Sequence, residues 1–240
     1  MEENHQRGSV QEVPNQAPNQ HHRQVPPAPQ LLVFDLDGTL IDSKDDLIAS
    51  VNAVRAHLDL PPLPGPTIAS YVGNGAPVLI RKALGPTASD ETIAAALDYF
   101  IRYYHDHSLD QTRLYPGCQE VLAAARARQI PCAILTNKPV KISHHILAGL
   151  KVAPYFFQVY GGNSFATKKP DPEGLLSLIR EANVSPAHTY MIGDSSVDIQ
   201  TARNAQTFAV GLTYGLQPES LITVPPDLLL DRMEDLLPYL

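Results

Sequence analysis

Residues 31–40 of the chain read LLVFDLDGTL. Four apolar residues come first, and the acidic turn that begins at Asp35 ends them at once. A short apolar run bounded by turn residues is typical of a strand that is covered on both faces, as in a parallel sheet. Open sheets of this kind bind their ligands beyond the carboxyl ends of the strands. These residues therefore predict a buried first strand with Asp35 and Asp37 at its ligand-binding end.

The same pattern recurs further along the chain. Residues 132–135 end at Thr136-Asn137, and residues 190–192 end at Gly193-Asp194. Weaker apolar runs lie at 156–160, 208–210 and 228–230, and helix start signals predict intervening helices over 139–149, 172–182 and 195–204. Strands that alternate with helices of this length predict an α/β fold with a doubly wound parallel sheet.

One connection breaks the alternation. Between the first strand and a helix predicted over 118–129, the chain shows helical patterns only, at 44–58, 67–84 and 89–107. A purely helical insertion of this length is too long for a loop. We expect a small all-helical cap domain inserted after the first strand, with the cap over 44–113 and the α/β core over 31–43 and 114–240.

The rest of the composition limits the partners and the compartment. Residues 1–30 are rich in Gln, Pro, Asn and His and have no apolar period, which predicts a disordered tail. The 240 residues carry a net charge of −7 without a cluster of Lys or Arg, which argues against nucleic-acid and membrane partners. No apolar run approaches the length of about 18 residues that spans a bilayer, and no signal peptide pattern is present. Two separated cysteines, Cys118 and Cys132, favour the cytoplasm, and we expect a monomer or homodimer.

Two acidic pairs follow predicted strands. Asp35 and Asp37 lie two residues apart, so their carboxylates can face one point, and a bound cation would relieve their repulsion. Mg²⁺ suits such an all-oxygen site with a substrate phosphate, whereas the alternative is an Asp-rich turn that only ends the strand. Asp194 and Asp198 alone are explained equally well as caps of the following helix. Beside the first pair, however, Asp194 is expected to bind the same metal ion.

Two further elements favour an anionic ligand. Thr136 and Asn137 place a hydroxyl and backbone N–H groups near the start of the helix predicted at 139, which is a typical arrangement for binding an anion. Lys168-Lys169-Pro170 supplies cationic donors just before the helix predicted at 172, although an exposed lysine pair is the ordinary alternative.

These elements, in this order, resemble the four motifs of the haloacid dehalogenase superfamily of phosphatases. The matching residues are Asp35 to Leu40, Thr136, Lys169 and Gly193 to Asp198. The helical insert corresponds to the helical cap of that superfamily, and the resemblance extends over about residues 31–235. Finer matches resemble the phosphoglycolate phosphatase branch, and they are Tyr71 to Ala76, Leu135 to Pro139, Tyr160-Gly161-Gly162, Lys168 to Pro172 and Val210 to Gly215.

The resemblance implies an enzyme that hydrolyses a small phosphorylated metabolite, 2-phosphoglycolate, with Mg²⁺ as cofactor and an aspartyl phosphate as intermediate. It makes Asp35 the nucleophile and Asp37 the general acid and then the base. Mg²⁺ would be held by the Asp35 carboxylate, the backbone carbonyl of Asp37 and the Asp194 carboxylate.

The remaining site residues implied by the resemblance contact the substrate or support residues that do. Thr136, Asn137 and Lys169 would bind the phosphoryl group, and Asp198 would pair with Lys169. Gly73, Asn74 and Gly75 of the cap would receive the carboxylate of the substrate through backbone N–H groups and the Asn74 amide.

Three residues depart from the pattern of the superfamily. Val197 stands where Asn is frequent, Asn163 where this branch usually has Asp, and Gln206 where Gly is common, so that Gln206 is expected to require an unusual turn. The alternatives within enzymes are a pyrophosphatase or other small-phosphate hydrolase and a sugar-phosphate mutase; Thr39 favours a phosphatase over a mutase. A non-enzymatic phospho-acceptor module is disfavoured, because such modules lack a long helical insert.

Overall fold

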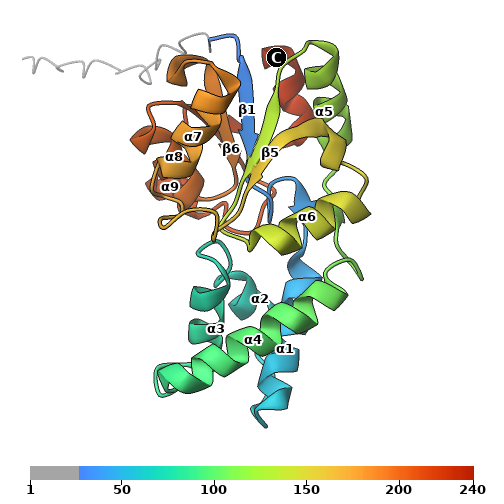
Figure 1. The fold of residues 1–240 in the computed structure, drawn as a ribbon, viewed down its shortest axis with the longest axis vertical. Helices are drawn as coiled ribbons and strands as arrows, with labels where there is room; N and C mark the ends of the chain where they lie inside the picture. The colour runs from blue at the N-terminus through green and yellow to red at the C-terminus, as the bar shows by residue number, and fades with distance from the viewer. Residues whose placement is uncertain (1–26) are drawn as a thin grey trace, which may run out of the picture.

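The computed structural model describes residues 27–240. Residues 1–26 of the predicted tail lie outside this described range. An α/β core and a helical part lie end to end (Figure 1). Residues 27–30, which the sequence prediction assigned to the tail, contact the core. The backbone N–H of Gln30 donates to the carbonyl of His188 at 2.8 Å, and the hydroxyl of Tyr190 donates to the carbonyl of Pro27 at 2.7 Å.

Six parallel strands form the main sheet, in the order β5-β4-β1-β6-β7-β8, which confirms the predicted fold class. Their bounds are β1 Leu31–Phe34, β4 Cys132–Leu135, β5 Phe156–Tyr160, β6 Thr189–Gly193, β7 Phe208–Leu212 and β8 Leu228–Leu230. The central position of β1 explains its four consecutive apolar residues, all of which are buried. Because both its faces are covered, the strand shows a continuous apolar run instead of alternation.

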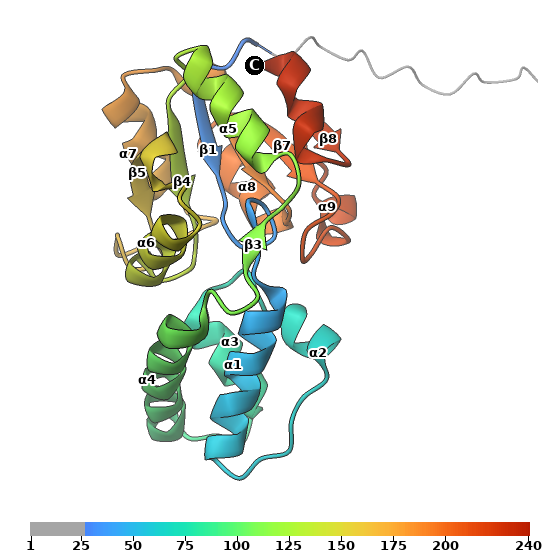
Figure 2. The same cartoon turned by 90° about the vertical axis from the view of Figure 1, so that its right-hand side faces the viewer.

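Helices cover both faces of this sheet (Figure 2). Leu32 and Phe34 face a core built with α5 and α6, whereas Leu31 and Val33 face a core built with α7, α8 and α9. The bounds are α5 Cys118–Ala127, α6 Val140–Gly149, α7 Glu173–Ala182, α8 Ser196–Asn204 and α9 Ser220–Thr223, with short 3₁₀ helices at Ala153–Tyr155, Pro186–His188 and Met233–Tyr239. This two-sided packing is the doubly wound arrangement that the strand and helix order predicts.

Four helices follow β1 in the chain and make up the helical part. They are α1 Lys44–His57, α2 Gly65–Ala69, α3 Ala76–Leu84 and α4 Asp90–His107. The prediction of a single helix over 67–84 is wrong, because the chain turns between α2 and α3. Gly73 and Gly75 there have φ of 104° and 84°, values that a helix cannot contain. Across residues 27–240, no helix combines the length and the apolar character needed to cross a membrane.

A two-stranded ribbon carries the chain between the core and the helical part (Figure 2). It pairs β2 Ile41–Asp42 with β3 Arg113–Leu114 in antiparallel register. The buried carboxylate of Asp46 accepts hydrogen bonds from the backbone N–H groups of Gln111 and Thr112 and from the Thr112 hydroxyl. These bonds tie the outgoing and returning segments together at the start of α1. The division into a cap and a core at residues 44 and 113 stays a prediction.

Candidate active site

The carboxyl ends of three neighbouring strands bring the predicted polar residues to one edge of the sheet. Asp35 follows β1, Thr136 follows β4, and Asp194 follows β6. The backbone N–H of Asp35 donates to the carbonyl of Ile192 at 2.9 Å, which continues the pairing of β1 with β6. Residues separated by more than a hundred positions in the sequence therefore meet because their strands are adjacent and parallel.

Three buried carboxylates form a cluster at this edge. Oxygen atoms of Asp35, Asp194 and Asp198 lie within 4.8 Å of one another. Burial raises the pKa of Asp35 to about 6, against the opposing effect of Lys169, and burial together with the neighbouring carboxylates raises the pKa of Asp194 to about 8. The Asp35 Oδ1 atom is buried, and its polar neighbour among the described residues is the ammonium group of Lys169, at 2.8 Å. The three carboxylates carry more negative charge than one lysine can neutralise, and carboxylate oxygens suit a hard cation, so the residues present fit Mg²⁺.

The position of Asp194 is closely fixed. Its Oδ1 accepts from the Thr39 hydroxyl at 3.2 Å and its Oδ2 from the backbone N–H of Leu216 at 2.6 Å. A Cβ at Gly38 would lie 2.4 Å from Oδ2 of this carboxylate, and one at Gly215 would lie 2.3 Å from the same atom. Only glycine fits at either position, and this explains the Asp-x-Asp-Gly order of the first motif.

Lys169 lies between two carboxylates. Its Nζ is 2.8 Å from Asp35 Oδ1 and 2.5 Å from Asp198 Oδ1, and its side chain is 2% exposed. Burial alone would lower the pKa of Lys169, but Asp198 and Asp35 outweigh it and raise the pKa. The other oxygen of Asp198 accepts from the backbone N–H and hydroxyl of Ser195 at the start of α8. With both oxygens engaged, Asp198 holds Lys169, which is the pairing that the sequence analysis expected.

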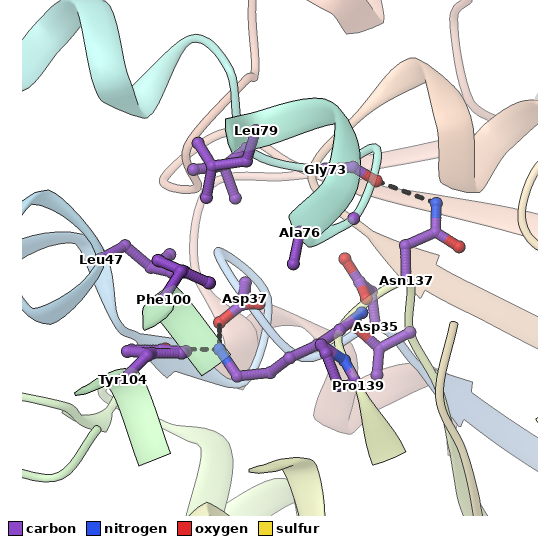
Figure 3. A pocket seen from close by; sticks show the side chains of 14 residues that line it. Asp35, Asp37, Leu47, Gly73, Ala76, Leu79, Phe100, Tyr104, Asn137 and Pro139 are labelled. Carbon is purple, nitrogen blue, oxygen red and sulfur yellow. Dashed lines mark hydrogen bonds and ion pairs between the residues drawn. The ribbon is translucent and has the colours of Figure 1, made fainter. Parts of the chain in front are cut away.

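Asp37 turns its side chain away from this cluster and toward the helical part. Its Oδ1 accepts from the Ser43 hydroxyl at 2.5 Å and from Lys138 Nζ at 2.7 Å. Lys138 also donates to the hydroxyl of Tyr104 from α4, and Figure 3 shows Asp37 and Tyr104 facing the same point. Burial lowers the pKa of Lys138, although Asp37 opposes this effect. The sequence analysis did not identify Lys138 as a site residue.

A small cavity of about 40 Å³ lies between these side chains and the helical part (Figure 3). Asp35, Asp37, Thr136 and Lys138 form its polar end. Apolar side chains close the other end, and they are Leu47, Val72, Leu79 and Phe100. At about 10–15 Å³ for each water, this cavity has room for about three water molecules.

The turn between α2 and α3 contacts the core through its carbonyl groups. Asn137 Nδ2 donates to Gly73 O at 2.9 Å, Lys168 Nζ donates to Asn74 O at 2.7 Å, and Gln217 Nε2 donates to the carbonyl of Val72. Gly73 and Gly75 line the cavity, whereas Asn74 does not. The structure therefore places two of the three predicted cap residues at the cavity.

Asn137 contacts both the turn between α2 and α3 and the core. Its Nδ2 also donates to the Lys169 carbonyl at 3.1 Å, and its Oδ1 is buried without a partner. Thr136 is buried, and its Oγ1 accepts from the backbone N–H of Lys138 at 3.3 Å. Binding of a phosphoryl group by these two residues stays a prediction.

Two of the three departures have a structural account. Gln206 has φ of 58°, which confirms the unusual turn expected where glycine is common. Asn163 Oδ1 accepts from the backbone N–H of Val140, the first residue of α6, at 3.0 Å. An amide oxygen caps that helix as a carboxylate oxygen would. Nothing in the structure explains Val197.

Comparison with known proteins agrees with the fold and shows the family. The family model of haloacid dehalogenase-like hydrolases matches residues 32–212, so the chain belongs to this family of enzymes. Among its relatives is a phosphoglycolate phosphatase of Pseudomonas putida, 38% identical over 216 residues, which cover 88% of this chain and 79% of that protein. A phosphoglycolate phosphatase of Vibrio vulnificus is 37% identical, with coverage of 87% and 94%.

The solved structures include a close match in fold. A predicted phosphoglycolate phosphatase from Haemophilus somnus superposes with a TM-score of 0.84 and is 31% identical, with coverage of 88% of this chain and 98% of that chain. The chain is therefore a haloacid dehalogenase-like hydrolase that is homologous to phosphoglycolate phosphatases.

Proposed function

We propose that this enzyme is a Mg²⁺-dependent phosphatase that hydrolyses 2-phosphoglycolate through a phosphorylated Asp35. The observation that carries the proposal is the small cavity of about 40 Å³ that has the carboxylates of Asp35 and Asp37 in its wall. A leaving group of two carbons suits so small a space, whereas a hexose would need the helical part to move away. The names of the relatives support the same substrate.

In the first half of the reaction, a carboxylate oxygen of Asp35 attacks the phosphorus atom and the bond to the leaving oxygen breaks. Asp37 gives its proton to that oxygen, and glycolate leaves. Thr136 and Lys169 hold the phosphoryl oxygens, where stabilisation of developing charge contributes most to catalysis.

In the second half, Asp37 accepts a proton from a water molecule that attacks the same phosphorus atom. Inorganic phosphate is released and the Asp35 carboxylate is restored. Two easier displacements thereby replace one difficult displacement.

The carboxylates of Asp35 and Asp194 and the backbone carbonyl of Asp37 would hold Mg²⁺. When bound, the cation offsets the repulsion between the Asp35 carboxylate and the phosphate. Asp198 contributes by holding Lys169, as its two engaged oxygens indicate.

The other functions that the sequence left open have less support. A sugar-phosphate mutase would need more room beside Asp35 than the small cavity there provides. A pyrophosphatase remains the second candidate, because pyrophosphate is also small, and a comparison of kcat/KM for 2-phosphoglycolate and pyrophosphate distinguishes the two. We propose the cytoplasm as the compartment, in line with two buried free thiols at Cys118 and Cys132.

The experiment is phosphate release from 2-phosphoglycolate by the purified full-length chain with Mg²⁺, for the wild type and Asp35→Asn. An amide is a poor nucleophile and carries no charge for the metal, so turnover should be lost. Acid quenching with ³²P-labelled substrate should trap label on the wild type and none on Asp35→Asn. Asp45→Asn, at an exposed position of α1, is the matched control and should behave as the wild type. Wild-type turnover by a folded Asp35→Asn protein would refute the mechanism.

A further inference from the structure

Lys138 is the one cationic side chain that lines the cavity within the described part of the chain. Its side chain is 3% exposed, so the ammonium group contacts protein atoms and almost no solvent. Lysine is rarely buried to this extent unless it is paired, and here the pairing partners are Asp37 and Tyr104. The position is therefore held at a desolvation cost that calls for an explanation.

An ammonium group has three N–H donors. One of them serves Asp37 Oδ1 at 2.7 Å and a second serves the Tyr104 hydroxyl. The third donor has no acceptor among the described residues, although Lys138 lies in the cavity wall. A ligand in the cavity can supply the missing acceptor.

The walls decide what kind of acceptor fits. The apolar side chains of the wall, which include Leu47, Leu79 and Phe100, offer no hydrogen bond to the part of the substrate beyond the phosphate. A carboxylate buried against such side chains without a charged partner would bind poorly, because desolvation of the ion is not offset. A neutral leaving group has no such requirement.

We propose that Lys138 is a specificity-determining residue that binds the carboxylate of the substrate's leaving group; this inference rests on the proposed function. It places the recognition of that carboxylate in the core, two residues after Thr136, and not in the cap turn at Asn74. The phosphoryl group and the carboxylate of one small substrate are then bound by side chains from the same strand end.

A different role for Lys138 would be to act only on Asp37, whose Oδ1 it contacts. In that case its loss would slow every substrate that needs a proton on its leaving oxygen, whatever the charge of that leaving group. The two roles are separated by a pair of substrates that differ in this charge alone.

The test compares 2-phosphoglycolate with 2-phosphoglycolamide, its uncharged amide of nearly the same shape, using kcat/KM with the full-length chain and Mg²⁺. In Lys138→Met, we expect the ratio of the two kcat/KM values to fall by about 10- to 100-fold, the usual worth of a charge-assisted hydrogen bond. The change should appear mainly in KM for 2-phosphoglycolate. Lys138→Gln, which keeps a donor for Tyr104, provides a second neutral variant should the methionine protein not fold. Lys141→Met, an exposed position of α6, should leave the ratio unchanged.

Equal losses on both substrates in a folded Lys138 variant would overturn the inference and leave Lys138 as a partner of Asp37. The inference would also be overturned if Asn74→Leu lost the preference for 2-phosphoglycolate over its amide while Lys138→Met kept it. That result would assign the binding of the carboxylate to the cap turn. Failure of the proposed function looks different, since the wild type itself would then show no preference for 2-phosphoglycolate over its amide and over other phosphates.

Discussion

Asp198→Asn should destabilise the fold, although it replaces one side chain by another of the same shape. Asp198 Oδ1 lies 2.5 Å from Lys169 Nζ, and Oδ2 accepts from the backbone N–H of Ser195 at 3.1 Å. An amide has one oxygen that accepts and one nitrogen that donates. Whichever way the new side chain is turned, its NH₂ group faces either the Lys169 ammonium or the Ser195 N–H. Both side chains of the ion pair are almost fully buried, so water cannot take over the lost interaction.

Removal of one partner of a buried ion pair costs about 3–5 kcal/mol, and we expect about 3 kcal/mol here because Asp35 stays 2.8 Å from Lys169 Nζ. For a chain of this length, 1 kcal/mol shifts the melting temperature by about 2–4 °C, which gives a decrease of about 6–12 °C. Differential scanning calorimetry measures the shift. The control is Asp171→Asn near the start of α7, where an exposed carboxylate accepts from the Glu173 N–H and Asn can do the same. A melting temperature of Asp198→Asn within about 2 °C of the wild type, or an equal decrease in the control, would refute the reasoning.

Three further outcomes are expected. Mg²⁺ should raise the melting temperature more at about pH 8 than at about pH 5. The pKa is raised to about 6 for Asp35 and to about 8 for Asp194, so their protonated forms stabilise the metal-free fold below about pH 4. This stability is lost as the pH rises through 6 to 8, where the carboxylates become charged and can bind the cation. The metal-free melting temperature is measured with EDTA at each pH, and an equal rise on addition of Mg²⁺ at the two pH values would contradict this expectation. Gly215→Ala should weaken Mg²⁺ binding by about 10- to 100-fold in calorimetric titration, since its Cβ would lie 2.3 Å from Asp194 Oδ2, and an unchanged Kd would disprove it. Gln217→Leu should raise KM by about 2- to 10-fold, because it removes the hydrogen bond to the carbonyl of Val72 that holds the helical part against the core, and a wild-type KM would show that this bond does not matter.

The core strands could be predicted because their signals are local. Residues 31–34 and 132–135 are the strands β1 and β4 as expected, and the run at 190–192 extends by one residue at each end in β6. A strand buried on both faces must be apolar throughout, and a parallel strand must end where its ligand-binding turn begins. The acidic turns after β1 and β6 therefore marked the site edge without any knowledge of the structure.

The cap was predicted less well. The apolar period continues from Thr67 to Leu84, and it favoured one long helix. Two glycines within that span, at 73 and 75, were the available sign of a break, and their positive φ values show that the chain needs them to turn. Periodicity outweighed them in the sequence analysis because it reports which face is apolar and not whether the helix is continuous.

Lys138 could not be identified as a site residue from the sequence, although it lies within the motif from Leu135 to Pro139. Lysine is usually exposed, so composition gives no reason to expect it in a cavity. Its burial depends on Tyr104 and Asp37, which lie 34 and 101 positions away in the chain. The direction in which Asp37 turns has the same origin, since the contact that fixes it comes from a distant element.

The central claim is that this enzyme selects a small phosphorylated carboxylic acid, and the comparison of kcat/KM across substrates tests it most directly. The measurement takes the wild-type chain with Mg²⁺ and compares 2-phosphoglycolate with glucose 6-phosphate and pyrophosphate. The small cavity beside Asp35 predicts a kcat/KM for 2-phosphoglycolate at least about 10-fold above both. A value for glucose 6-phosphate or pyrophosphate that equals or exceeds that for 2-phosphoglycolate would contradict the claim.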